Sequence, residues 1–287
     1  MRNALIFILA LVFSTSCTKH VVVDVDNPPI DSTITAADRS SFVNGVYIAL
    51  LGRKPLDTEF DQTLIQLEVD PYSEAVRRAI VQGLQSEESA AFVILQNSLN
   101  RYLDGTDTAG LRAEYNYCVN QAQNAGSQSA IDYWTEKAQQ FFPLLTATED
   151  LHSATLTYVG LQKYIIDNRI YDQINMGTEN FVVSAYNNYY LRYPSATEQA
   201  DAITMVNGYD ASLYGVSGKG KADFIDVFFD QTEFYQGIVV TQFEQYLLRQ
   251  PTTYELYHHT QTVAASGGDW AALQLELLGS YEYIKNK

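Results

Sequence analysis

Apolar and aromatic residues recur every three or four positions through most of the chain, which is the spacing of one face of an α-helix. Within residues 95–180 this spacing predicts helices over 109–125, 129–142 and 149–171. Glycine or proline separates these stretches. The alternation typical of strands is absent, and the one strand-like run is Val21-Val22-Val23. The pattern therefore predicts an all-α protein.

A different pattern occupies the first 16 residues. Arg2 precedes an apolar run over residues 4–13, and small residues stand directly before Cys17. Ten apolar residues are too few to span a bilayer, so the run is typical of a secretory signal. The box around Cys17 resembles a lipoprotein signal, although Ser14 stands where an aliphatic residue is usual. We expect cleavage before Cys17 and lipid on that cysteine, the alternative being an ordinary signal with an incidental cysteine.

The residues after Cys17 bear on where the protein is anchored. Thr18 is not the aspartate that retains lipoproteins in the inner membrane, so we expect the outer membrane. Which face of that membrane the protein occupies stays open. Residues 17–34 contain Asn27-Pro28-Pro29 and no helical period, which predicts an extended tether. The folded part should begin near Thr35.

An internal repeat is the most informative feature of the chain. The pattern Arg-x-Pro-x-x-x-Glu occurs three times, and an aromatic residue stands six positions before each arginine. We predict a helix that ends at the corner, because proline disfavours helix in the residue before it, and a second helix after the proline. A third helix should follow. Each copy then ends with a serine or threonine beside acidic residues, which we call the closing element. The motif residues are Arg53, Pro55 and Glu59; Arg192, Pro194 and Glu198; and Arg249, Pro251 and Glu255.

The start of the second helix carries its own signal in two copies. Ser195-x-x-Glu198 and Thr252-x-x-Glu255 match the capping box, in which a hydroxyl and a carboxylate bond free backbone N–H groups. The first copy has Leu56 there, so its helix should begin at Asp57. The resulting division is a signal at 1–16, a tether at 17–34, helical repeats at 35–94, 181–236 and 237–287, and a helical insertion at 95–180.

The first copy also carries a family resemblance. Residues 47–55 read Tyr-Ile-Ala-Leu-Leu-Gly-Arg-Lys-Pro, with Glu59 and a closing Ser86-Glu87-Glu88. This resembles a bacterial helical domain of unknown function that is itself similar to phycobilisome linker domains, and the chain as a whole resembles a Bacteroidota-like outer-membrane lipoprotein. The second copy departs from the pattern at Leu191, where glycine belongs. The resemblance implies an interaction module of envelope assemblies and supplies no catalytic residues.

Charge and cysteine content narrow the possible partners. The formal net charge is −16, which excludes the concentrated positive face that nucleic acid binding needs. The same sign disfavours attraction to anionic lipid, so we expect membrane contact through the acyl chains alone. After lipidation, Cys118 would be the last thiol, and its apolar setting predicts a buried, unreactive side chain.

Residues that could perform catalysis or bind a metal do not converge in the sequence. His258 and His259 form the one histidine cluster. Glu255 and His259 are four positions apart on a predicted helix and could share a metal, but no third ligand is evident, so we expect a surface or capping role. Ser217-Gly218-Lys219-Gly220 resembles a phosphate loop but has no predicted strand before it, which favours a flexible connector. Three similar corners indicate that the repeated arginines serve the fold. We therefore predict a non-enzymatic protein without cofactor or metal.

Tyrosine is unusually frequent, with 21 copies in 287 residues. A cluster at Tyr186, Tyr189, Tyr190 and Tyr193 is the candidate interface, since tyrosine offers rigid contact area with a polar tip. Core packing is the alternative for most of these residues. Our first hypothesis is a scaffold protein that binds other envelope proteins, and the second is a surface glycan-binding lipoprotein of a nutrient-uptake system. A hydrolase ranks third.

Overall fold

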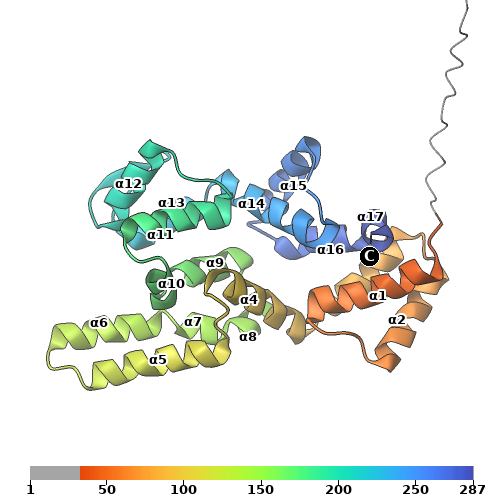
Figure 1. Ribbon diagram of the computed structural model, residues 1–287, viewed down its shortest axis with the longest axis horizontal. Coiled ribbons are helices and arrows are strands. Elements are labelled where there is room, and N and C mark those ends of the chain that lie inside the picture. The colour runs from red at the N-terminus through yellow and green to blue at the C-terminus, as the bar shows by residue number, and fades with distance from the viewer. Residues whose placement is uncertain (1–32, 287) are drawn as a thin grey trace, which may run out of the picture. The chain divides into compact units, whose positions relative to one another are not determined.

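The computed structural model describes residues 33–286 and confirms the predicted all-α class (Figure 1). The expected signal, the lipidated Cys17 and nearly all of the expected tether lie outside the described residues and stay predictions. The folded body begins at Ile34, one residue earlier than expected, because the Ile34 side chain is buried in the core. Thr35 then caps the first helix by accepting the backbone N–H of Asp38 at 3.1 Å.

The segment of the first motif copy contains four helices, and its corner lies between the first two. The chain bends there at Gly52, whose φ of 66° is the left-handed conformation that glycine adopts without steric cost. The next helix begins at Asp57, as predicted from Leu56. The helices are α1 (Ala36–Leu51), α2 (Asp57–Val69), α3 (Glu74–Gln85) and α4 (Glu88–Tyr102).

The insertion is more broken than its periodicity suggested. The long helix expected over 149–171 is wrong, since it is divided into α8, α9 and α10. Ala154 takes a left-handed φ of 58°, and the side chains of Thr157 and Asn168 accept backbone N–H groups that begin two new helices. The elements are α5 (Thr108–Gln123), α6 (Gln128–Gln139), α7 (Phe142–Leu145), α8 (Ala147–His152), α9 (Tyr158–Ile166) and α10 (Arg169–Ile174).

The segment of the second copy contains a small hairpin that the sequence did not predict. Strands β1 (Ala211–Leu213) and β2 (Val216–Gly218) pair antiparallel, so the expected flexible connector at 217–220 is wrong for its first two residues. The first helix of this copy ends in a π-helical turn, η1, which replaces the glycine corner of the first copy. The remaining elements are α11 (Thr178–Ala185), η1 (Tyr186–Tyr190), α12 (Ala196–Val206) and α13 (Lys221–Phe229).

One helix serves both the second and the third corner. Helix α14 (Thr232–Gln242) begins with the closing element of the second copy and continues as the first helix of the third (Figure 1). It runs into a π-helical turn, η2 (Phe243–Leu247), after which Leu248 is left-handed, just as Leu191 is after η1. The last helices are α15 (Thr253–Ala265), α16 (Trp270–Gly279) and α17 (Tyr281–Lys285).

Helices α3 and α16, which precede two closing elements far apart in sequence, pack against each other. The contact is reciprocal. Arg77 of α3 donates through Nε to the Gly279 carbonyl at 2.8 Å, and Gln85 of α3 donates to the Ala271 carbonyl at 3.0 Å. Counted back from the serines that follow the two helices, Arg77 corresponds to Ala271 and Gln85 to Gly279. The two helices are therefore related by a local two-fold arrangement that joins the first and last parts of the body.

None of the helices in residues 33–286 combines the length and apolar character that crossing a membrane requires.

Candidate functional site

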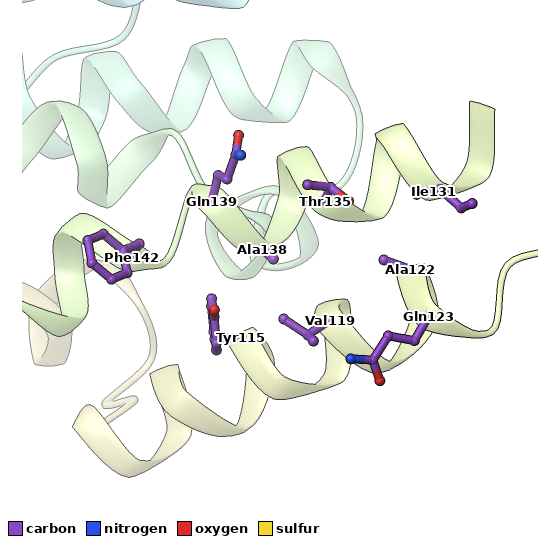
Figure 2. Close-up of a pocket in the computed structure, with 9 residues that line it drawn as sticks. All are labelled: Tyr115, Val119, Ala122, Gln123, Ile131, Thr135, Ala138, Gln139 and Phe142. Carbon is purple, nitrogen blue, oxygen red and sulfur yellow. The ribbon is translucent and has the colours of Figure 1, made fainter. Parts of the chain in front are cut away.

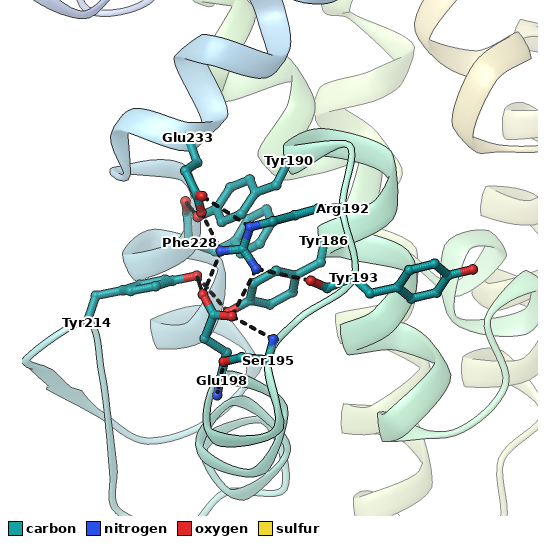
Figure 3. A network of polar contacts seen from close by, with 9 residues as sticks. All are labelled: Tyr186, Tyr190, Arg192, Tyr193, Ser195, Glu198, Tyr214, Phe228 and Glu233. Carbon is teal, nitrogen blue, oxygen red and sulfur yellow. Dashed lines mark hydrogen bonds and ion pairs between the residues drawn. The ribbon is translucent and has the colours of Figure 1, made fainter.

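The second corner shows how the repeated residues are used (Figure 3). Arg192 donates through Nη1 and Nη2 to the two carboxylate oxygens of Glu198, at 2.9 and 2.6 Å. Glu198 also accepts the backbone N–H of Ser195 at 2.7 Å, and the Ser195 hydroxyl accepts the N–H of Glu198 at 3.3 Å. The predicted capping box is confirmed, and its glutamate also holds the arginine.

A second glutamate binds the other edge of the same guanidinium. Glu233 accepts Arg192 Nε–H at 3.1 Å and Nη2–H at 2.5 Å (Figure 3). Glu233 is the second residue of α14, where a carboxylate is favoured by the helix dipole. Two-point Arg–carboxylate contacts fix geometry as well as charge. Arg192 thus connects the corner to the helix that closes this copy.

The third corner repeats this arrangement with its own residues. Arg249 donates through Nη1 and Nη2 to Glu255 at 2.9 and 2.7 Å. Glu282, the second residue of α17, accepts Nε–H at 2.6 Å and Nη2–H at 2.8 Å. The glutamate of the closing element is therefore a direct partner of the motif arginine in both later copies. In the sequence it was recognisable only as an acidic residue beside a hydroxyl residue.

The first corner keeps one half of the contact. Arg53 donates to Glu59 at 2.6 and 2.7 Å, and Glu59 accepts the Leu56 N–H at 2.7 Å. Within residues 33–286 the structure records no hydrogen bond from Arg53 to the closing helix. The second residue of α4 is Ser89, where α14 and α17 have glutamate. The first copy therefore lacks the second two-point contact.

The upstream aromatic residue has the same position in all three corners. The guanidinium carbon lies 5.8 Å from the ring centre of Tyr47 for Arg53 and 5.3 Å from that of Tyr186 for Arg192. For Arg249 the ring is Phe243, at 5.1 Å. These distances are within the range of cation–π attraction. The six-residue spacing found in the sequence therefore places an aromatic face under each arginine.

The electrostatics of the corners favour fixed ion pairs. Hydrogen bonds from the arginine lower the pKa of each motif glutamate, Glu59, Glu198 and Glu255, to about 2. The carboxylates in turn raise the pKa of Arg192 and Arg249. All these groups are ionised at neutral pH, and none is poised to exchange a proton with a substrate. The geometry therefore supports a structural role for the repeated arginines.

The candidate tyrosine interface is wrong for three of its four residues. Tyr186, Tyr189 and Tyr190 are buried, because the π-helical turn directs their rings into a cluster with helix α13. The Tyr190 hydroxyl donates to the Phe228 carbonyl at 2.6 Å, and the two rings stack with centres 4.1 Å apart. Tyr193 points away from the cluster and is 72% exposed (Figure 3). Core packing, the alternative, describes this cluster better.

Tyr214 is a corner residue that the sequence analysis missed. It lies in the turn of the β1–β2 hairpin, and its hydroxyl is 2.9 Å from Glu198 Oε1 and 2.7 Å from the Tyr186 hydroxyl (Figure 3). A carboxylate only accepts, so Tyr214 donates to Glu198 and accepts from Tyr186. Burial raises the pKa of both tyrosines, which keeps these hydroxyls protonated. Gly215, with a φ of 80°, was the sequence signal for this turn.

The histidine pair has a different environment from the one expected. His259 is buried, against our expectation of a surface or capping role, and burial lowers its pKa. Its Nδ1 is 3.7 Å from Glu276, while His258 stacks on Tyr254. Residues 33–286 contain no group of three metal-ligating side chains. Cys118 is buried and unpaired with another cysteine, and burial raises its pKa, as its apolar neighbours predicted.

An apolar groove of about 490 Å³ lies on the α5–α6 hairpin (Figure 2). The two helices run side by side (Figure 1). Side chains of both helices line the groove between them (Figure 2). No charged side chain lines it. The sequence analysis predicted both helices but not the groove between them. Its lining residues are Tyr115, Val119, Ala122 and Gln123 of α5, Ile131, Thr135, Ala138 and Gln139 of α6, and Phe142.

No protein-family model, no curated protein and no solved structure matches the chain. The resemblance to helical linker-type domains therefore stays a prediction.

Proposed function

We propose that this protein is a non-enzymatic lipoprotein, held at the outer membrane by lipid on Cys17, whose helical body is an interaction module in an envelope assembly. The folded body begins at Ile34, the last residue of the tether predicted over residues 17–34. The motif arginine and glutamate form an ion pair at each of the three corners. This supports a structural role for the repeated residues.

The α5–α6 groove is the observation that carries the proposal. The two helices together bury just Leu111, Cys118 and Ala138. Phe142, which lines the groove, remains 59% exposed. Contiguous exposed apolar surface on a water-soluble body marks an interaction surface, because leaving it in water costs free energy. A protein surface that covers the groove would recover that free energy.

Glycan binding is the second candidate, and one observation favours it. Tyr254 and Tyr257 lie three residues apart on α15 and are 75% and 67% exposed. Exposed rings on one helix face offer a stacking platform for sugars. The burial of Tyr186, Tyr189 and Tyr190 removes the larger platform that the sequence suggested.

The anchoring part of the proposal is tested by Cys17→Ala. We expect the wild-type chain to incorporate a fatty-acid analogue during growth and to fractionate with membranes. The variant should incorporate none, because the acceptor thiol is gone. Equal labelling of both chains would refute the lipoprotein assignment.

The interaction part is tested by affinity capture from the native envelope after mild detergent extraction. We expect the wild-type chain to co-purify with envelope proteins, and a Gln123→Glu/Gln139→Glu variant to lose them, since its groove carries two new charges. A Tyr254→Ala/Tyr257→Ala variant is the comparison. If the wild-type chain returns alone, binds polysaccharide by calorimetry and loses that binding in the tyrosine variant, the glycan-binding alternative is correct.

A further inference from the structure

The groove residues form one stripe on each helix of the hairpin. On α5 they are Tyr115, Val119, Ala122 and Gln123, with spacings of four, three and one. On α6 and just after it they are Ile131, Thr135, Ala138, Gln139 and Phe142, with the same spacing. Such stripes are typical of helices that pack against another layer in a bundle. Two helices alone supply half of a four-helix bundle.

The opposite side of the hairpin is fixed to the body. Arg169 of α10 forms an ion pair with Glu114 of α5. Its guanidinium lies 4.9 Å from the ring centre of Tyr117 and 5.9 Å from that of Trp134, so it contacts both helices. These contacts of Arg169 involve residues outside the groove, and they hold α5 and α6 together. The groove is therefore a preformed surface, which lowers the entropic cost of binding.

Charge indicates which partner the groove fits. The whole chain carries −16, so most of its surface repels a second copy. Within the two helices, Arg112 and Lys137 nearly balance three acidic residues, Glu114, Asp132 and Glu136. The hairpin is thus a part of the chain where two copies can approach with little repulsion.

The polar residues of the groove are compatible with self-pairing. Gln123 and Gln139 each carry an amide, which donates and accepts hydrogen bonds. An amide can therefore bond the same residue of an identical partner, as a two-fold interface requires, whereas two carboxylates would repel each other.

We infer that the α5–α6 groove is the dimerisation surface of this protein, and that its occupant is the α5–α6 hairpin of a second copy, which completes a four-helix bundle. At about 1.5 Å per residue α5 is about 24 Å long and α6 about 18 Å, so a face about 20 Å wide on each copy gives a total of roughly 700–1,000 Å², at the lower bound of specific interfaces. The inference rests on the proposed membrane anchoring in one respect, because tethering two copies to one surface raises their effective concentration.

Sedimentation velocity of the full chain in mild detergent tests the inference. We expect the wild-type chain to sediment as a dimer. The Gln123→Glu/Gln139→Glu variant should dissociate at least tenfold more readily, since four carboxylates would meet in the interface. The matched control is Gln66→Glu/Gln82→Glu on α2 and α3, which makes the same charge change at exposed residues outside the groove and should dimerise like the wild type.

Two results would overturn the inference. One is a wild-type chain that stays monomeric up to about 100 µM, which would mean a dissociation constant above that concentration. The other is a groove variant that dimerises as tightly as the control. Circular dichroism of both variants establishes that they are folded, and both substitutions replace exposed amides, so loss of core packing is not expected. Fatty-acid labelling of Cys17 is independent of both results. Capture of envelope proteins separates the two proposals, because a wild-type chain that stays monomeric and loses its envelope proteins in the groove variant would keep the proposed function and overturn the dimer alone.

Discussion

Arg249 and Glu282 are joined by two hydrogen bonds, of 2.6 and 2.8 Å, across 33 residues of sequence. Arg192 and Glu233 have the same relationship in the second copy. Each arginine therefore holds three elements together: the end of one helix, the capped start of the next, and the first turn of the closing helix. Loss of the arginine leaves two glutamates facing each other without a cation between them.

Arg192→Ala and Arg249→Ala should each lower the free energy of unfolding by about 1–2 kcal/mol, the lower part of the range for charged hydrogen bonds because a third of each side chain is exposed. Thermal and urea unfolding followed by circular dichroism measure the loss. Arg53→Ala is the internal comparison and should lose less, since Arg53 has one carboxylate partner and is more exposed. An unchanged melting curve in both later variants would contradict the structural role and make Arg192 and Arg249 interface residues to map next.

The first copy can be given the contact it lacks. Ser89→Glu places a glutamate at the second residue of α4, the position of Glu233 in α14 and of Glu282 in α17. We expect the melting temperature to rise by about 1–3 °C, because a carboxylate in the first helical turn is favourable and Arg53 lies at the equivalent corner. Ser89→Gln is the neutral control of similar size. In an Arg53→Ala background the gain should shrink, and an equal gain there would attribute it to the helix dipole alone.

Acid should weaken the corners. The pKa of Glu198 and of Glu255 falls from 4.5 to about 2 in the folded protein, mainly through the arginine hydrogen bonds. A lowered folded pKa means that the stability is present above about pH 4.5 and is lost as the pH falls toward 2. Urea unfolding at pH 7, 5 and 3 should show a loss in the wild type that is smaller by about 1–2 kcal/mol in Glu198→Gln or Glu255→Gln. Parallel pH profiles for all three chains would exclude the corners as the acid-sensitive groups.

The sequence predicted what depends on local chemistry. Helical spacing gave the fold class, Pro194 and Pro251 gave the corner positions, and the Ser195 and Thr252 boxes gave two helix starts. Each of these rests on interactions between residues close in sequence.

What the sequence did not predict depends on contacts between distant segments. The burial of Tyr186 depends on Phe228 and on Tyr214, neither of which its own helix specifies. Apolar stripes on α5 and α6 have the same spacing whether a third layer covers them or not, so periodicity alone did not reveal the groove. The pairing of Arg192 with Glu233 likewise required the position of α14.

Gly237 marks the closest approach between α14 and η1. A Cβ atom at Gly237 would lie 1.9 Å from the Tyr189 carbonyl oxygen, which is backbone and has little freedom to move. Gly237→Ala should therefore cost about 3 kcal/mol, the upper part of the usual range for overpacking, and should separate α14 from the tyrosine cluster. Gly83→Ala on α3 is the matched control, because no atom lies within 4 Å of its Cβ and alanine favours helix, so it should gain about 0.5–1 kcal/mol. Urea unfolding measures both changes, and near-ultraviolet circular dichroism reports the packing of the tyrosines. If Gly237→Ala were as stable as the wild type, the close packing of α14 on η1 would be wrong.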